Sequence, residues 1–347
     1  MTLLLNYRPV LSQPTGIGVY AHAVLPELQR LPHCFVSGGG RGGAPQRLQR
    51  LLWSQFHLPR LAQRHHASLI FTPAPEGYLG TQAVPQVVMV HDLRPLSHPD
   101  RDLQTLYFQT WVPALLKHCI HIITNSRFTA QEIERHIQIP ASRISVIPLG
   151  IDHDVFVVSE PATPSIPDLG PYLLHVGQAY PHKNLSRLIR VFGRLANQYP
   201  ELRLLLVGKP LPSQTSVLHD LVRALGLVNR VVFMPYCSAD QLPNLYRRAL
   251  ALVYPSLWEG FGLPILEAMA CGTPVVSSSG SAIEEVAGDS ALLVNPLNED
   301  ELFAAVEAVL REPRLRDHLS LKGLERAALF NWSTTAEQTA NLLNGFL

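Results

Sequence analysis

The sequence predicts an α/β protein built from two doubly wound domains, each a parallel sheet with helices on both faces. Short runs rich in Val, Ile and Leu alternate along the chain with segments of helical periodicity, as in parallel strands joined by crossover helices. The runs lack strict polar–apolar alternation, which indicates strands that are buried on both faces. With 347 residues, 47% of them hydrophobic, the chain is too long for one typical core and suits two.

The expected strands divide between the two halves of the chain. Those of the first half are Leu3–Tyr7, Ser68–Thr72, Val87–Val90, His121–Thr124 and Ile144–Ile147. Those of the second half are Tyr172–Val176, Leu202–Val207, Val231–Phe233, Ala251–Tyr254, Pro274–Ser277 and Leu292–Val294. Between the halves, Ser159–Pro171 holds four prolines, which cannot continue a helix or a central strand. We therefore place the first domain at 1–160, a linker at 161–171 and the second domain at 172–331.

Charge and cysteine usage argue against several classes of function. The formal net charge of +1 gives no electrostatic basis for binding nucleic acid. The four cysteines form no CxxC pair, so zinc and disulfide frameworks are poorly supported and a reducing, cytoplasmic location is the simplest context. The basic amphipathic segment Arg47–Arg60 fits a packed helix with its arginines in water, which is the favoured interpretation. The alternative is a peripheral contact with the inner face of a membrane.

One turn of the second half carries most of the chemistry that the sequence indicates. In doubly wound sheets, ligands bind at the carboxyl ends of the strands. After the expected strand Ala251–Tyr254, a glycine-containing loop leads to a helix that we expect to begin near Pro264 and to stop at Gly272. The start of such a helix presents unpaired N–H groups and a positive dipole end, which attract a diphosphate.

Two carboxylates flank this turn. Glu259 lies in the loop, and we expect Glu267 in the first turn of the helix. Each can accept hydrogen bonds from two neighbouring hydroxyls, as on a hexose or a ribose. Gly260 and Gly262 let the backbone approach a ligand closely. A solvated surface pair is the usual interpretation of two carboxylates, but the glycines, the proline and the preceding apolar strand favour a ligand site.

The segment Glu259–Glu267 matches the E-x7-E motif of retaining glycosyltransferase family 4, and the chain resembles that family over nearly its whole length. Further matches in the family's usual order are Val146–Asp152, Gly272–Ser277 and Glu285–Asp289. The resemblance implies two Rossmann-like domains that face each other across a cleft, the glycosyltransferase B-type fold. It also implies that residues 332–347 form a helix that returns to the first domain, with Ser333 as its N-cap.

The resemblance assigns roles around the motif. In the family the first Glu contacts the donor sugar and the second contacts the ribose, which implies those roles for Glu259 and Glu267. Backbone groups of the turn between them would line the sugar and the diphosphate. These groups belong to Gly260, Phe261, Gly262 and Leu263.

Lys183 stands just past the expected strand Tyr172–Val176, in a stretch that is similar to the family pattern G-x-x-x-P-[RH]-K-N. Most lysines are ordinary surface residues, but the resemblance implies that this one neutralises the leaving diphosphate. Family members often carry an Arg directly after the Gly or directly before the Lys. Those places hold Gln178 and His182 here, so one cationic contact is absent unless a protonated His182 supplies it.

The first half contributes three further candidates. Gly16 and Gly18 fit a loose GxGxxA pattern, but the acidic residue that a nicotinamide site needs about 20 residues on is missing. We interpret them as a backbone cradle for the donor phosphates, similar to the family's first loop. His91 follows the strand Val87–Val90, and the resemblance places it near the reacting carbon of the donor sugar; a loop-capping histidine is the alternative. Asp92 fits a structural role.

The reaction that the resemblance implies is transfer of a hexosyl group with retention, by front-face attack of the acceptor, with His91, Lys183 and Glu259 as catalytic residues. Lys183, the expected helix start at Leu263–Pro264 and the Gly18 loop form a set of fixed positive groups that would substitute for a metal, so we expect neither a metal nor a cofactor. The motifs look most like those of bacterial mannosyltransferases of polysaccharide assembly, which makes GDP-mannose the first donor, followed by UDP-glucose and other UDP-hexoses. The acceptor would be a saccharide or a lipid-linked molecule. The alternatives are a nucleotide-sugar epimerase of the same fold and a non-catalytic nucleotide-sugar-binding protein.

Overall fold

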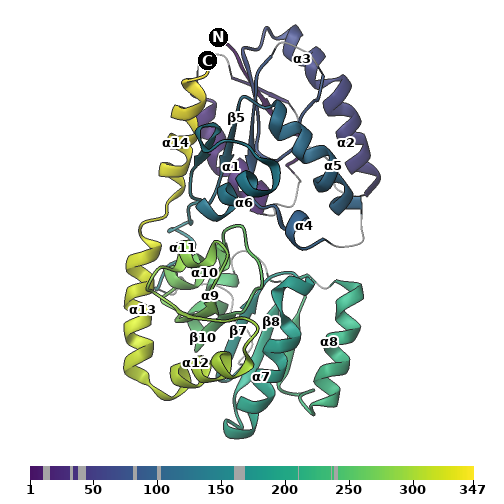
Figure 1. The fold of residues 1–347 in the computed structure, drawn as a ribbon. Helices are drawn as coiled ribbons and strands as arrows, with labels where there is room; N and C mark the ends of the chain where they lie inside the picture. The colour runs from purple at the N-terminus through teal and green to yellow at the C-terminus, as the bar shows by residue number, and fades with distance from the viewer. Residues whose placement is uncertain are drawn as a thin grey trace. The chain divides into compact units, whose positions relative to one another are not determined.

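The computed structural model describes residues 1–10, 16–31, 34–37, 44–80, 84–99, 103–159, 169–209, 211–235, 237 and 241–347 (Figure 1). The chain divides into two compact units: Met1–Gly150 with Asn331–Leu347, and Ile151–Phe330. The chain thus leaves the first unit at Gly150, whereas the sequence analysis placed that end at 160. Residues 160–168, most of the expected linker, lie outside the described residues.

The first unit holds a sheet with the strand order β2-β1-β3-β4-β5-β6, and all its described pairs are parallel. Its strands are β1 (Leu3–Asn6), β2 (Cys34–Ser37), β3 (Leu69–Thr72), β4 (Gln86–Val90), β5 (His121–Thr124) and β6 (Ile144–Val146). Its helices are α1 (Gly16–Leu28), α2 (Ala44–Phe56), α3 (Leu58–Arg64), α4 (Arg94–Ser97), α5 (Leu103–His118), α6 (Arg127–Ile137), the 3-10 helix η1 (Ala141–Arg143) and α14 (Trp332–Asn344).

The second unit repeats this plan with the order β12-β11-β10-β7-β8-β9, again parallel throughout its described pairs. Its strands are β7 (Tyr172–Val176), β8 (Arg203–Val207), β9 (Val231–Met234), β10 (Ala251–Tyr254), β11 (Val275–Ser278) and β12 (Leu292–Val294). Its helices are the 3-10 helix η2 (Pro181–Lys183), α7 (Leu185–Gln198), α8 (Pro212–Ala224), α9 (Leu242–Arg248), α10 (Leu263–Ala270), α11 (Ile283–Ala287), α12 (Glu299–Arg311) and α13 (Pro313–Ala327). The predicted α/β class with two doubly wound sheets is therefore confirmed.

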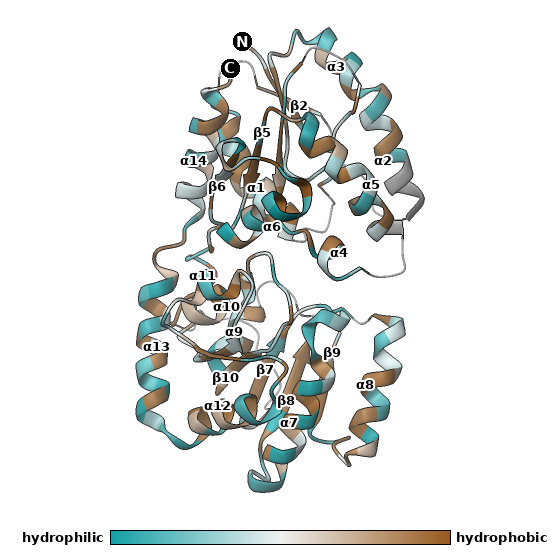
Figure 2. Cartoon of the chain, viewed as in Figure 1, coloured by the Kyte–Doolittle hydropathy of each residue, from teal (hydrophilic) through white to brown (hydrophobic). Residues whose placement is uncertain are grey.

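Burial explains why these segments form these elements. The central residues of β5 and β8 are hydrophobic (Figure 2), and both strands are almost wholly buried, because helices cover both faces of the sheet. Helix α7 buries Leu188, Phe192 and Leu195, which are spaced so that they share one face of a helix. That face packs into a hydrophobic core cluster of the second unit.

Strand β2 is a described strand that the sequence analysis missed. It pairs with β1 at the edge of the first sheet, with Leu4 opposite Phe35. Only its last residue, Ser37, is fully buried, so β2 lacks the apolar run that marks a central strand. Ser37 Oγ accepts a hydrogen bond from the Tyr7 N–H at 3.0 Å, which fixes the ends of the two strands together.

Helix α14 packs against α1 within the first unit (Figure 1). The hydroxyls of Tyr20 on α1 and Thr339 on α14 lie 3.4 Å apart in a buried hydrogen bond. At the entry to α14, Gly150 is so close that a Cβ there would lie 2.2 Å from the Trp332 nitrogen. Only glycine fits at such a distance, so this residue fixes where the returning chain joins the unit.

The expected N-cap of α14 was wrong. The helix begins at Trp332, and the side chain of Asn331 accepts a hydrogen bond from the Thr334 N–H at 2.8 Å. Ser333 lies inside the first turn, where its hydroxyl donates to Asn331 Oδ1 at 2.6 Å. Asn is as good an N-cap residue as Ser, so the sequence Asn331-Trp332-Ser333 offered two caps and the earlier one is used.

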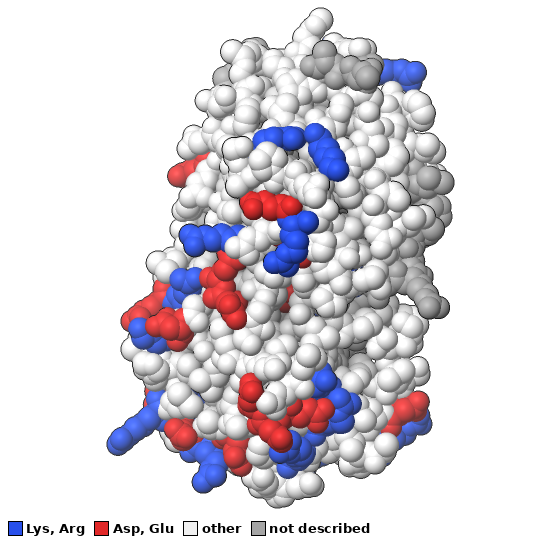
Figure 3. All heavy atoms as spheres, in the orientation of Figure 1, with Lys and Arg blue, Asp and Glu red and all other residues white. Residues whose placement is uncertain are grey.

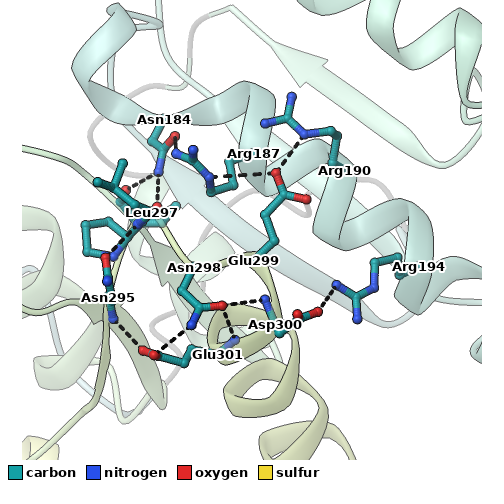
Figure 4. A network of polar contacts seen from close by, with 12 residues as sticks. Asn184, Arg187, Arg190, Arg194, Asn295, Leu297, Asn298, Glu299, Asp300 and Glu301 are labelled. Atoms are coloured by element: carbon teal, nitrogen blue, oxygen red, sulfur yellow. Dashed lines mark hydrogen bonds and ion pairs between the residues drawn. The ribbon is translucent and has the colours of Figure 1, made fainter.

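Asn184 ties together three loops at the carboxyl edge of the second sheet (Figure 4). Its Nδ2 donates to the carbonyls of Pro255 at 3.1 Å and Pro296 at 2.8 Å, in the loops after β10 and β12. Arg187 Nη1 donates to Asn184 Oδ1 at 2.6 Å. The side chain thus uses both its donors and its acceptor, and it links the loop after β7 to its neighbours.

Ion pairs extend this network over the surface of α7 and α12. Arg190 lies 2.8 Å from Glu299 and Arg194 lies 2.7 Å from Asp300. These side chains are largely exposed, so each pair contributes only about 0–1 kcal/mol. On the face drawn in Figure 3, positive and negative side chains are interspersed.

Candidate functional site

Two loops meet at the carboxyl edge of the second sheet. One follows β7 and contains η2, and the other follows β10 and leads into α10. Strands β7 and β10 are neighbours, and the Leu257 N–H donates to the His182 carbonyl across the two loops at 2.7 Å. This arrangement brings together Lys183 and Glu259, two of the residues that the sequence analysis selected.

Lys183 and Glu259 form a largely buried ion pair. Lys183 Nζ lies 2.5 Å from Glu259 Oε1, and each side chain is only 12% exposed. Burial by itself would raise the pKa of Glu259, but the charges of Lys183 and His182 and the hydrogen bond from Lys183 outweigh it and lower that pKa. Glu259 is therefore a carboxylate at neutral pH. When such a pair separates, the carboxylate can accept hydrogen bonds from sugar hydroxyls and the ammonium can donate to phosphate oxygens.

Tyr254, the last residue of β10, holds the same ammonium from the sheet. Lys183 Nζ donates to the Tyr254 hydroxyl at 2.6 Å and lies 4.9 Å from the centroid of its ring. Tyr254 is 1% exposed. Burial, reinforced by the negative charge of Glu259, raises the pKa of Tyr254 well above its ordinary value. The phenol therefore stays protonated beside Lys183.

The turn into α10 has the backbone that the sequence predicted. Gly262 is the N-cap residue and adopts a left-handed conformation with φ of 109°, which favours glycine. Pro264 stands in the first turn of the helix, and Gly272 follows its end with φ of 73°. Phe261 is 6% exposed and packs edge-on against Phe330, so its side chain belongs to the core and only its backbone is available to a ligand.

Glu267 lies in the second turn of α10, not in the first as predicted, because the helix already begins at Leu263. The Tyr246 hydroxyl, on α9, donates to Glu267 Oε2 at 2.6 Å. Burial raises the pKa of Glu267 to about 7, although the Tyr246 hydrogen bond acts in the opposite direction. One oxygen of this carboxylate is thus fixed by the protein.

His175, on β7, is a residue of this site that the sequence analysis missed. Its ring stacks on Tyr254, with centroids 5.3 Å apart and planes 15° from parallel. Its Nδ1 lies 3.1 Å from the Val253 carbonyl, which can only accept, so Nδ1 carries the proton. Burial, with the Val253 hydrogen bond acting in the opposite direction, lowers its pKa to about 4, so the ring is neutral. The signal in the sequence was its position two residues before Gly177, at a strand end.

His182 and Lys209 are further basic residues at this edge, where the family's arginine is absent. His182 stacks on Tyr180, with centroids 5.6 Å apart, and its charge contributes to the lowered pKa of Glu259. Lys209 is exposed and follows β8, the neighbour of β7. A Cβ on Gly208 would lie 2.1 Å from the Gly177 carbonyl oxygen, so the two loops are in contact. A lysine directly after a strand end was a signal that the sequence analysis did not use.

His91 belongs to the first unit, where it follows β4. Its Nε2 lies 3.0 Å from the Pro73 carbonyl, and Tyr20 meets its ring edge-on with centroids 5.3 Å apart. Burial, opposed by the Pro73 hydrogen bond, lowers the pKa of His91 to about 4, so this ring is also neutral. Asp92 Oδ1 accepts a hydrogen bond from the Arg94 N–H at 3.1 Å at the start of α4, which is a structural contact.

Gly16 and Gly18 lie in the first turn of α1 and not in a loop. Gly18 is buried, whereas Gly16 is exposed and has open space where a Cβ would be. The first N–H groups of a helix have no partner within the helix. The N–H groups that the sequence analysis expected in a loop therefore belong to the start of a helix. Thr15 lies outside the described residues. Among the residues that are described, no group of three or more His, Cys, Asp or Glu could hold a metal ion.

Comparisons with known proteins place the chain among glycosyltransferases. Residues 160–326 match the family model described as glycosyl transferases group 1, and residues 15–155 match the model described as glycosyltransferase family 4. The chain is 30% identical to the O-antigen chain mannosyltransferase B of Escherichia coli over 333 residues, which cover 91% of this chain and 86% of that protein.

A second relative is aligned over a shorter region. The chain is 33% identical to the O-antigen chain mannosyltransferase RfbU of Salmonella typhimurium over 228 residues, which are 66% of this chain and 62% of the relative. Among solved structures, a sucrose-phosphate synthase from Thermosynechococcus elongatus superposes with a TM-score of 0.79 at 21% identity, covering 99% of both chains. At that identity the likeness concerns the fold.

Proposed function

Because this chain belongs to the group 1 glycosyltransferases, we propose that it transfers a hexosyl group from a nucleotide-diphosphate sugar to a saccharide or lipid-linked acceptor, with retention at the anomeric carbon. The observation that carries the proposal is the Lys183–Glu259 pair, 2.5 Å apart and 12% exposed, beside the start of α10. An ammonium, a carboxylate and a helix start at one sheet edge supply partners for a diphosphate and a sugar.

The proposed roles combine the family resemblance with the contacts of the candidate site. Glu259 would accept hydrogen bonds from the donor sugar, and Glu267, held by Tyr246, would accept them from the ribose. The backbone from Gly260 to Leu263 would line the diphosphate at the start of α10. Lys183 would stabilise the charge that develops on the leaving diphosphate. In the first unit, His91 would approach the reacting carbon, and the start of α1 at Gly16 and Gly18 would offer N–H groups to phosphate.

GDP-mannose is the proposed donor, because the two relatives are both named as O-antigen mannosyltransferases. UDP-glucose and other UDP-hexoses are the second choice. The same names suggest an acceptor from bacterial polysaccharide assembly. A thermal-shift panel of GDP- and UDP-sugars tests the donor, since a ligand that binds only the folded state raises the melting point. A panel in which GDP-mannose causes no shift and a UDP-hexose does would reassign the donor.

Product analysis separates the alternatives. A transferase releases the nucleoside diphosphate and forms a glycoside only when an acceptor is present. An epimerase converts the donor sugar without an acceptor, and a binding protein shifts the melting point with no turnover. Formation of an α-glycoside from an α-linked donor, resolved by NMR, would establish retention; a β-glycoside would exclude it.

We also propose that transfer is independent of metal ions, with Lys183, the start of α10 and the start of α1 serving as the fixed positive groups. Transfer should then continue in excess EDTA at the rate measured without it. Loss of activity in EDTA and its recovery on adding Mg²⁺ or Mn²⁺ would contradict this.

A peripheral membrane contact is the remaining part of the proposal. None of the helices in the described ranges is long and apolar enough to cross a bilayer. Helix α2 nevertheless exposes Leu52 by 50% and Phe56 by 56%, and Arg60 on α3 is exposed four residues further on. Co-sedimentation with anionic but not neutral vesicles, lost in a Leu52→Ser/Phe56→Ser variant, is the expected result; no sedimentation with either would leave α2 as an ordinary surface helix.

A further inference from the structure

His175 carries a buried nitrogen acceptor that has no role in the proposed function. The side chain is 0% exposed, and its Nε2 has no hydrogen-bond partner among the described residues. Because Nδ1 donates to the Val253 carbonyl, Nε2 holds a lone pair. An unpaired acceptor inside a protein is unfavourable because it loses its hydrogen bond to water, so its presence next to a ligand site requires an explanation.

Lys183 lies beside this acceptor. A Cβ built on Gly177 would lie 3.6 Å from His175 Nε2, 3.6 Å from Lys183 Cε and 3.8 Å from Lys183 Nζ. The two side chains therefore border the same small space, which is open because residue 177 has no side chain. Within the described residues, the ammonium donates to the Tyr254 hydroxyl and to Glu259 Oε1, whereas an ammonium has three N–H donors.

Binding of the nucleotide-sugar donor changes the hydrogen-bond partners of the Lys183 ammonium. This step rests on the proposed function, in which the sugar engages Glu259 and the diphosphate engages Lys183. Glu259 then ceases to be the main partner of the ammonium, and one N–H turns to the phosphate. The Tyr254 hydroxyl can retain a second N–H, because it is fixed at the end of β10. A third N–H needs an acceptor that is neutral, buried and close, which describes His175 Nε2.

We propose that His175 is a positioning residue that, together with Tyr254, holds the Lys183 ammonium after the donor has displaced Glu259. The neutral ring suits this role, since a protonated imidazole would repel the ammonium. Stacking on Tyr254 and the hydrogen bond to Val253 fix the direction of Nε2. In this scheme His175 contacts no atom of the nucleotide-sugar donor and acts only through Lys183.

Two substitutions test the Nε2 acceptor of His175 separately from the rest of its side chain. His175→Asn retains an N–H near Nδ1 for the Val253 carbonyl but is too short to place an acceptor at Nε2. His175→Gln reaches the position of Nε2 with an amide oxygen. The readout is the Kd for GDP and UDP and for the donors GDP-mannose and UDP-glucose, measured by titration calorimetry on the full chain without an acceptor substrate. Only the two donors carry the sugar that displaces Glu259. Melting temperatures of both variants report whether each is folded.

For whichever nucleotide-sugar donor binds the unsubstituted protein, His175→Asn should weaken binding of that donor by about tenfold to a hundredfold, the range for a hydrogen bond to a charged group. His175→Gln should stay within a few-fold of the unsubstituted protein. Adding His175→Asn to Lys183→Met should cause no further loss, because the two residues act as one unit. Equal weakening by Asn and Gln, or additive losses with Lys183→Met, would mean a purely structural role and would overturn the inference.

Failure of the proposed function gives a different pattern. If Lys183→Met alone binds GDP and UDP as tightly as the unsubstituted protein, then Lys183 does not contact the diphosphate and both the assigned site and the role of His175 are wrong. If Lys183→Met weakens binding but His175→Asn does not, the site stands and only the role of His175 is rejected.

Discussion

The hydroxyl of Tyr246 donates a 2.6 Å hydrogen bond to Glu267, from one helix of the second unit to the next. Tyr246 is fully buried, and the Thr273 hydroxyl donates to its carbonyl at 2.7 Å. The phenol is therefore a fixed donor that restrains one carboxylate oxygen and orients the other. The same burial makes the negative charge of Glu267 unfavourable, which links ligand binding at this residue to protein stability.

The Glu267 carboxyl should make the stability of the ligand-free protein depend on pH. Its pKa is raised from 4.5 to about 7 in the folded protein, so its favourable contribution is complete below about 4.5 and is lost as the pH rises through about 7. Glu267→Gln should remove this loss while keeping an acceptor for Tyr246. Melting temperatures between pH 5 and 8.5 should therefore diverge, with the variant the more stable at high pH; parallel curves would contradict the raised pKa.

Breaking the Lys183–Glu259 pair should affect activity and stability in separable ways. Replacing either residue by Ala should reduce turnover by at least about a hundredfold if each stabilises the transition state. Removing one partner also leaves the other as an unpaired buried charge, which destabilises by about 3–5 kcal/mol. The double variant Lys183→Met/Glu259→Gln should be as inactive as either single variant but more stable than both in urea denaturation. Unchanged turnover in both Ala variants would exclude the assigned site.

Asn184 should be more important for the arrangement of the loops than for contact with a ligand. Its backbone is left-handed, with φ of 61°, so Asn184→Ala adds strain to the loss of three hydrogen bonds. Asn184→Gly loses the hydrogen bonds but relieves the strain, so it should be more stable than the Ala variant by about 1 kcal/mol. Both should weaken binding of the donor. If the two variants were equally stable, the left-handed conformation would not be a constraint at this position.

Lys209 should supply part of the positive charge that the family's arginine provides elsewhere. Lys209→Ala should weaken GDP or UDP binding by about fivefold to tenfold, less than Lys183→Met, because an exposed ammonium is screened by solvent. The loss should shrink as the salt concentration rises. Lys322 on α13 is also solvent-exposed and is the matched control, so an equal effect of Lys322→Ala would argue for a general charge effect instead of a local contact.

The sequence predicted the sheets better than it predicted the site. Central strands were recognisable because most of their residues are apolar and buried, whereas the edge strand β2 was missed because only Ser37 is fully buried. Helix ends depended on choices between adjacent polar residues, which is why Ser333 was preferred to Asn331. That the two sheets face one cleft remains a prediction.

Within the candidate site, the sequence analysis selected the charged residues but not the side chains that hold them. Glu259 and Lys183 stand out in a motif, but Tyr246, Tyr254 and His175 lie in a helix or strand and look like ordinary core residues. Their role in holding the charged residues is evident only from contacts between residues about 70 positions apart, such as Lys183 and Tyr254. Pairing of distant segments is a property of strand order, which local sequence patterns do not determine.

The contact of Gly150 with the start of α14 has a consequence for protein engineering. The second unit is one continuous stretch of chain, whereas the first is interrupted by it. Because residue 150 lies directly against Asn331 and Trp332, the two pieces of the first unit could be joined by a very short glycine linker. The protein can thus be regarded as a host domain carrying an insertion, and each half could be expressed as a separate polypeptide.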